Sequence, residues 1–464
     1  MTMTERLRRA LEAVERHCRG STSEAGELRP FTRDFGGMSE REPAFVLRPS
    51  HAADVTTALS IANEFDVPVS TRGAGHGQAG HCLGAGMVLD MRGLDRIEAV
   101  AEGASVVEVE AGATWRAVFD ATFPKRRIPA APTLVVNTTV GGTLSVGGVG
   151  ATSFRFGPQV DNVAFLDVAT LDGQIRRASA SENHELFDAV RAGRGQCGVI
   201  LRAGYRVVPV GSRLRTRSFV YSTADRFVED VERVCADVEA PRFVTGAVVR
   251  SPKLPKRCLF LLFVGRDYER EEDLRNLPLP KFACDEELPA KDDPLWDASG
   301  VPGHIFFRHY SPVPESLDAD PNTLHPWVEH LFDAEQAKIA LLEVSTRYLD
   351  LATRGSCGLI LVRRGASPAP LMATPVGASL SFGIGMFAAF ASREREAARQ
   401  QMTEYSEHFS ALGGKRYLSG YLPFESARAY REHHGAAWNA FASAKERFDP
   451  KHLLSAESIA WADA

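Results

Sequence analysis

Apolar positions near the start of the chain follow a helical period between two short apolar runs. The segment SHAADVTTALSIANEFD (50–66) has apolar residues at helical spacing, with Asp54 in its first turn. The flanking runs PAFVLRP (43–49) and VPVSTRG (67–73) have the composition of strands. This order predicts a β-α-β unit. A surface helix is expected before it, because charged residues in the first ten positions leave no apolar segment for a signal peptide.

Short strand-like runs replace this pattern further along. They are MVLDM (87–91), SVVEVEAGA (105–113), NVAFLDVATLDG (162–173) and GVILRAGYRVVPV (198–210). After residue 212, helical patterns such as ADRFVEDVERVCADV (224–238) alternate with strands such as CLFLLFVGR (258–266) and GLILVRR (358–364). We expect an α+β protein with one domain over 1–212 and a second over 213–416. The charged stretch PLPKFACDEELPAKDDP (278–294) predicts a long surface loop.

Glycine is concentrated in three loops of the first domain. They are RGAGHGQAGHCLGAG (72–86), TTVGGTLSVGGVG (138–150) and RAGRGQCG (191–198). Glycine lets backbone N–H groups approach a ligand where a Cβ atom would be in the way. The three loops therefore predict a shared site for a ligand held by backbone donors.

The first loop contains Gly75, Gly77 and Gly80 in the spacing of the dinucleotide fingerprint G-x-G-x-x-G. That fingerprint must open a helix, because the pyrophosphate is held at the helix N-terminus. Residues 81–90, HCLGAGMVLD, predict a loop followed by a strand instead. The context thus argues against a nicotinamide cofactor.

Several segments, in order, resemble the vanillyl-alcohol oxidase superfamily with its PCMH-type FAD-binding domain, and most of all its cytokinin dehydrogenase and berberine-bridge-like branches. They include TRGAGHGQAG, TTVGGTLSVGGVGATSFRFGPQVDNVAFLDVATLDG, ENHELFDAVRAGRGQCGVI, LHPWVEHLF, KRYL and AAWNAFASAKERFDPKHLLS. The resemblance implies a two-subdomain FAD-binding domain and a substrate domain with an antiparallel sheet covered by helices. It also implies that residues 417–464 fold back onto the FAD domain.

The resemblance further implies FAD bonded covalently to His76 through its 8α-methyl carbon. Gly75 and Gly77 would give that histidine the backbone freedom that the attachment needs. A cysteine that makes a second linkage in some relatives is Val135 here, so a single linkage is expected. The expected FAD contacts are Gly73, Ala74, Gly75, His76, Gly77, His81, Cys82, Thr139, Gly142, Ser145, Val149, Val199, Tyr417 and Ser455.

Two departures concern the substrate. Leu134 and Thr245 stand where cytokinin dehydrogenases carry an aspartate that accepts a proton and an acidic substrate anchor. Hydride loss from a substrate carbon needs a base elsewhere. Tyr417 and Tyr421 are the leading candidates, followed by His309, Tyr310 and Glu343.

Arg363 and Arg364 end a predicted strand in the second domain. A guanidinium pair suits a substrate carboxylate, so we hypothesise a clamp there. Oxidation coupled to loss of CO2 would then be possible, since a quinone methide formed from a para-hydroxybenzylic carbon can collapse by decarboxylation.

Composition narrows the class of protein. The 464 residues are 44% hydrophobic and 24% charged, with a net charge of −5 and no basic stripe. Nucleic acid and membranes are therefore not expected as partners. The seven cysteines show no CxxC spacing, which favours reduced thiols in a cytoplasm over disulfides or a metal site.

We therefore predict a cytoplasmic FAD-dependent oxidoreductase that takes a hydride from a small phenolic or alcohol-bearing metabolite. Its partners would be that substrate and O2 or another electron acceptor. A cytokinin-type amine dehydrogenase and a non-catalytic flavin-binding protein are the alternatives.

Overall fold

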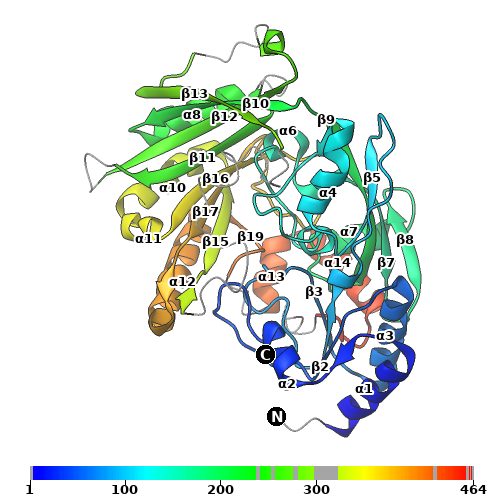
Figure 1. Cartoon of the computed structure of the whole chain (residues 1–464). Coiled ribbons are helices and arrows are strands. Elements are labelled where there is room, and N and C mark those ends of the chain that lie inside the picture. Colours follow the sequence, from blue (N-terminus) through cyan, green and yellow to red (C-terminus); the bar gives the residue numbers. More distant parts are fainter. Residues whose placement is uncertain are drawn as a thin grey trace.

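The computed structural model describes residues 4–236, 241–251, 257–274, 281–296, 322–421, 426–455, 459 and 461. Figure 1 shows an upper-left part built on one large sheet and a lower-right part built on two smaller sheets. No helix among the described residues has the length and apolar character needed to cross a membrane.

The predicted β-α-β unit forms a small sheet at the start of the chain. Its strand order is β1 (Ser21–Thr22), β2 (Phe45–Leu47), β4 (Met87–Asp90), β3 (Val69–Arg72), and the last three are parallel. Helices α1 (Glu5–His17) and α3 (Ala52–Phe65) bury an apolar core against it; α2 (Ala25–Leu28) is a single turn. As predicted, no helix follows the first glycine loop, which leads directly into β4.

A five-stranded sheet follows, in the order β5 (Val106–Glu110), β9 (Val199–Pro209), β7 (Val163–Ala169), β8 (Ile175–Ser179), with β6 (Arg127–Pro129) also on β9. Helices α4 (Trp115–Thr122), α5 (Val140–Leu144), α6 (Ser153–Phe156) and α7 (His184–Val190) lie between these strands in the chain. The Trp115 indole N–H donates to Thr143 Oγ1 (2.9 Å) in the core, which ties α4 to the second glycine loop.

The large sheet is antiparallel throughout, as expected for the second domain. Its order is β13 (Glu286–Pro294), β10 (Arg213–Tyr221), β12 (Cys258–Tyr268), β11 (Phe243–Arg250), β16 (Ser356–Val362), β17 (Ser381–Phe387), β15 (Trp327–Phe332), β19 (Lys415–Tyr417). Strands β14 (Thr323–Leu324) and β18 (Phe390–Ala391) form a separate pair. One face packs on α8 (Ala224–Ala236), α10 (Ala334–Thr346), α11 (Leu349–Thr353) and α12 (Arg395–Ala411) (Figure 1).

The prediction of a loop over 278–294 is wrong for its second half, because Glu286–Pro294 is the edge strand β13. Ion pairs to β10 explain why so polar a sequence forms a strand: Arg215 pairs with Asp292 (2.8 Å) and Arg217 with Glu287 (2.7 Å). An edge strand needs no apolar face, so hydrophobic periodicity could not reveal it.

The chain ends with α13 (Ala427–His434) and α14 (Ala437–Phe448), and α14 packs on α7. The buried Lys445 ammonium donates to the carbonyls of Gln196 (3.0 Å) and Leu454 (3.1 Å) and pairs with Asp449. The Val69 N–H donates to the Leu453 carbonyl (2.8 Å). These contacts hold the C-terminal segment against the third glycine loop and β3.

Candidate active site

One cavity lies between the two smaller sheets and the large sheet, and the three glycine loops form much of its wall. Every residue predicted to contact FAD lines it: Gly73, Ala74, Gly75, His76, Gly77, His81, Cys82, Thr139, Gly142, Ser145, Val149, Val199, Tyr417 and Ser455. These residues are far apart in sequence, so their meeting in one cavity is a property of the tertiary structure.

The first and second glycine loops touch at a point that requires glycine. A Cβ atom on Gly73 would lie 2.0 Å from Thr139 Oγ1. Gly75 has φ +79°, a conformation that L-residues rarely adopt. The first loop is also fastened to the large sheet, because the buried Gln78 amide donates to the His325 carbonyl (2.8 Å) and accepts from the Trp327 N–H (3.1 Å).

The His76 ring is held in a defined plane at the cavity wall. It stacks on Phe35 with ring centroids 4.6 Å apart and planes 21° from parallel. Phe35 in turn contacts the Trp327 ring at 5.2 Å. This stack spans both halves of the cavity, so a group bonded to His76 would lie between them.

His81 and Cys82 provide two further side chains in the first loop. Neither ring nitrogen of His81 has a hydrogen-bond partner among the described residues. Burial and the Arg194 charge lower the pKa of His81 well below its usual value, so the imidazole is neutral. Burial raises the pKa of the Cys82 thiol, to which an Arg72 N–H donates (3.1 Å).

Arg194, in the third glycine loop, brings a positive charge to the cavity. It is only 6% exposed, and its guanidinium donates to Tyr430 Oη (3.0 Å). Its Nε and second Nη atoms have no hydrogen-bond partner among the described residues. The Arg194 backbone has φ +55°, and its N–H donates to the Ser145 carbonyl (2.8 Å). This bond holds the Arg194 backbone beside the second glycine loop.

This wall fits a flavin dinucleotide. The loops offer backbone N–H groups and hydroxyls to the cavity, and the first two loops can meet there only because position 73 lacks a Cβ atom that would collide with Thr139. Arg194 offers free donors and a charge opposite to that of a pyrophosphate. The glycines would hold the cofactor, and His76 would anchor its ring.

Of the predicted catalytic tyrosines, only Tyr417 lines the cavity. Its hydroxyl accepts a hydrogen bond from the Gly148 N–H (2.7 Å), and burial raises its pKa. It therefore stays a protonated phenol. Tyr421 is buried outside the cavity lining, and its backbone N–H donates to the Trp327 carbonyl (2.7 Å).

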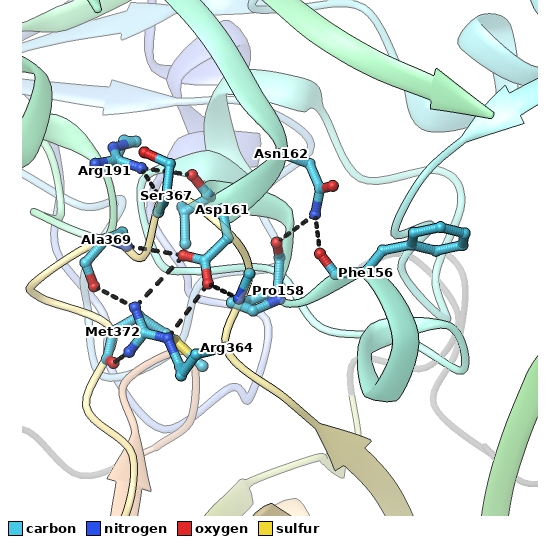
Figure 2. A network of polar contacts seen from close by, with 11 residues as sticks. Phe156, Pro158, Asp161, Asn162, Arg191, Arg364, Ser367, Ala369 and Met372 are labelled. Atoms are coloured by element: carbon cyan, nitrogen blue, oxygen red, sulfur yellow. Dashed lines mark hydrogen bonds and ion pairs between the residues drawn. The ribbon is translucent and has the colours of Figure 1, made fainter. Parts of the chain in front are cut away.

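The structure does not bring Arg363 and Arg364 to the cavity; both bind protein groups instead. Arg363 donates to the Cys235 carbonyl (3.0 Å). Figure 2 shows that the Arg364 guanidinium pairs with the buried Asp161 carboxylate (3.3 Å) and donates hydrogen bonds to the carbonyls of Ala369 (2.7 Å) and Met372. These bonds fix the turn after β16 to the FAD-binding half, which is a different task from clamping a substrate.

The weaker base candidates also lie elsewhere. Glu343, on α10, is outside the cavity lining and pairs with His408 (3.6 Å). His309 and Tyr310 lie outside the described residues.

The sequence interpretation missed the groups that the large sheet contributes. Glu329 and Trp327 from β15, Phe387 from β17 and Ser419 all line the cavity. Burial raises the pKa of Glu329 to about 7. The signal was present in HPWVEHLF (325–332), where a single acid interrupts an otherwise apolar and aromatic strand.

Leu134 and Thr245, which replace the acidic residues, do line the cavity. The Thr245 hydroxyl donates to the Leu359 carbonyl (2.6 Å) within the sheet. Neither residue brings a proton acceptor of the carboxylate kind to the site.

Comparison with known proteins agrees with this geometry. Residues 43–179 match the family described as FAD binding domain. Residues 387–458 match the family described as "Cytokinin dehydrogenase 1, FAD and cytokinin binding".

The relatives cover nearly the whole chain. Cytokinin dehydrogenase 1 of Oryza sativa subsp. japonica is 30% identical over 94% of this chain and 92% of its own length. The "uncharacterized oxidoreductase ORF5 in fasciation locus" of Rhodococcoides fascians is 29% identical over 91% of this chain and 94% of its own length. Cytokinin dehydrogenase 3 of Arabidopsis thaliana is 25% identical over 94% of this chain and 88% of its own length. The chain thus belongs to the family of FAD-dependent oxidoreductases that includes the cytokinin dehydrogenases.

Proposed function

We propose that this FAD-dependent oxidoreductase carries its flavin on His76 and oxidises a small phenolic or alcohol-bearing molecule. The observation that supports it is the single cavity that joins all fourteen expected FAD contacts to a wall of aromatic and acidic side chains. Bound FAD would supply a two-electron acceptor for a hydride from substrate carbon.

The protein's own groups then have distinct tasks. The glycine loops and Arg194 bind the cofactor, and the Phe35 ring orients His76 by stacking. Trp327, Phe387 and Ile360 offer apolar surface to a planar substrate. Val135, at the position of the second attachment cysteine, lines the cavity as an aliphatic side chain, which supports one covalent linkage.

The proposal favours oxidation without loss of CO2. The carboxylate clamp hypothesised for a decarboxylating route is not supported, because Arg363 and Arg364 bind protein groups away from the cavity lining. O2 or another acceptor would then reoxidise the flavin.

A cytokinin-type amine dehydrogenase is the second candidate. It is favoured by the match of residues 387–458 and by the names of the relatives. Leu134 and Thr245 argue against it, since neither side chain supplies the carboxylate expected at its position.

Acid precipitation of the purified protein tests the linkage. We expect yellow colour to stay with the wild-type pellet and to be absent from the pellet of His76→Ala. Colour released wholly into the wild-type supernatant contradicts the covalent link.

Anaerobic mixing tests the substrate class. We expect para-hydroxybenzyl alcohols to bleach the flavin and isopentenyl adenine to leave it oxidised. The reverse result establishes the amine alternative, and a flavin that dithionite reduces but neither group of compounds bleaches contradicts the proposed class.

A further inference from the structure

We infer that Glu329 is the proton acceptor of the reaction and that the substrate therefore presents an uncharged or cationic O–H or N–H group. This inference rests on the proposed function and adds to it the charge state of the substrate. Glu329, on β15, would thus accept the proton that an aspartate at position 134 would otherwise accept.

The sheet register places Glu329 beside two glycines and an aromatic ring. Glu329 on β15 pairs with Gly385 on β17, which pairs with Gly358 on β16. A Cβ atom on Gly385 would lie 2.5 Å from the Phe387 ring and 3.1 Å from Glu329 Cγ, so the glycine makes room for both side chains. The Phe387 ring covers Gly385 and Gly358, and the Glu329 carboxyl group therefore lies next to an aromatic ring of the cavity lining.

Glu329 is the only carboxyl group among the described residues of the cavity lining. No described lysine, arginine or histidine forms an ion pair with it, and among the described residues its side chain accepts one long hydrogen bond, from the Ser419 hydroxyl (3.4 Å). A carboxylate held this loosely keeps lone pairs available for a substrate proton.

The neighbouring titratable groups cannot take over this role. Tyr417, opposite Glu329 on β19, is a phenol whose oxygen already accepts the Gly148 N–H. Tyr405, on α12, is fully buried, and burial raises its pKa well above the usual value. His76 is assigned to the cofactor, and His81 and Arg194 belong to the glycine-loop wall.

The step balances as an ordinary alcohol or amine oxidation. The substrate C–H bond breaks and its electron pair leaves with hydrogen as hydride to FAD, which is reduced. The O–H or N–H bond breaks, and its proton goes to the Glu329 carboxylate as the C=O or C=N bond forms. The carboxyl group returns its proton to solvent after the flavin is reoxidised.

The Glu329 carboxylate also disfavours anionic substrates. A carboxylate-bearing molecule would place a second anion beside Glu329 between apolar walls, where charges interact more strongly than in water. A pKa of about 7 for Glu329 means that both of its forms exist at physiological pH, as a general base requires.

The flavin midpoint potential provides a test that needs no substrate. It would be measured for the flavin-loaded wild type, Glu329→Gln and Glu343→Gln from about pH 5.5 to about 8.5. We expect the wild-type potential to fall below that of Glu329→Gln as the pH rises through about 7, because an ionised carboxylate opposes electron uptake by the nearby ring. The two curves should converge at low pH, where the carboxyl group is neutral, while the control Glu343→Gln follows the wild type throughout. Coinciding curves for the wild type and Glu329→Gln overturn the inference.

Stopped-flow reduction with a compound that bleaches the wild type tests proton transfer itself. Glu329→Gln should slow flavin reduction by about 10²–10⁴-fold and remove the rise in rate through neutral pH. Reduction at the wild-type rate overturns the inference. If no phenol or alcohol bleaches the wild type, the proposed function fails, whereas the potentials still decide whether Glu329 titrates beside the flavin.

Discussion

The two walls of the cavity are built from different parts of the polypeptide. The cofactor wall is formed largely by the three glycine loops, each a short continuous segment that offers backbone donors. The substrate wall consists of side chains from strands of the large sheet. A backbone cradle leaves clusters of glycine in the sequence, whereas a wall of side chains leaves single residues scattered over more than one hundred positions. The comparison explains why the cofactor could be inferred from sequence motifs while the single acid at position 329 was overlooked.

The largest expected effect is on the cofactor wall, at Gly73. Gly73→Val should reduce the bound flavin to a small fraction of the wild-type content, because even the first added carbon meets Thr139 Oγ1 at 2.0 Å. The measurement is flavin absorbance per protein. Gly26→Ala is the matched control, since nothing lies within 4 Å of its added Cβ. Full flavin content in Gly73→Val would mean that the two loops move apart freely.

Arg364 tests whether the edge of the substrate wall binds substrate or supports structure. Arg364→Met leaves the buried Asp161 carboxylate without its cation, so we expect a loss of about 2–4 kcal/mol in the free energy of unfolding. Denaturant titration measures it. Arg250→Met is the control, because its partner Asp350 is exposed. An unchanged free energy of unfolding together with an increased KM would instead support the hypothesis that Arg364 binds a substrate carboxylate.

Arg194 tests the electrostatic part of the cofactor wall. In the His76→Ala background, Arg194→Met should weaken FAD binding by about 10- to 150-fold, since a charge-assisted hydrogen bond contributes roughly 1.5–3 kcal/mol. Titration of the apoprotein with FAD and with riboflavin measures this effect. Riboflavin, which lacks the pyrophosphate, should bind both proteins alike. An equal loss of riboflavin affinity would show that Arg194 does not bind the pyrophosphate.

Glu329 should also make stability depend on pH. Its folded pKa of about 7 lies above the ordinary 4.5, so the folded state binds the proton more tightly than the unfolded chain. The resulting stabilisation is complete below about pH 4.5 and is lost as the pH rises through 7. At pH 8, Glu329→Gln should therefore be more stable than the wild type by about 1–2 kcal/mol. Equal stabilities at pH 8 would show that the carboxylate is well solvated.

Prediction from sequence succeeded where a local pattern dictates the structure. The helix at Ala52–Phe65 and the strands β7 and β9 follow directly from hydrophobic spacing. The absence of a helix after Gly80 follows from the two glycines and the aliphatic run beyond it. Strand β13 was missed because its partner, β10, lies about seventy residues away and binds it through charges.

The candidate site divides in the same way. His76 and the loop glycines could be identified from a contiguous motif, and all of them line the cavity. Arg363 and Arg364 were assigned to the substrate from charge at a strand end, but their partners Cys235 and Asp161 are distant in the chain. Charge in a sequence does not reveal which buried group will neutralise it.

The sequence by itself determined that the chain is α+β, that three loops are rich in glycine, and that no acid stands at positions 134 and 245. Those properties depend on residue type and local spacing. Only the tertiary structure decided that Glu329 faces the cavity and that the two arginines do not. The reason is that the inward direction of a strand side chain is set by register, and the Glu329–Gly385–Gly358 row exists only when three distant strands pair.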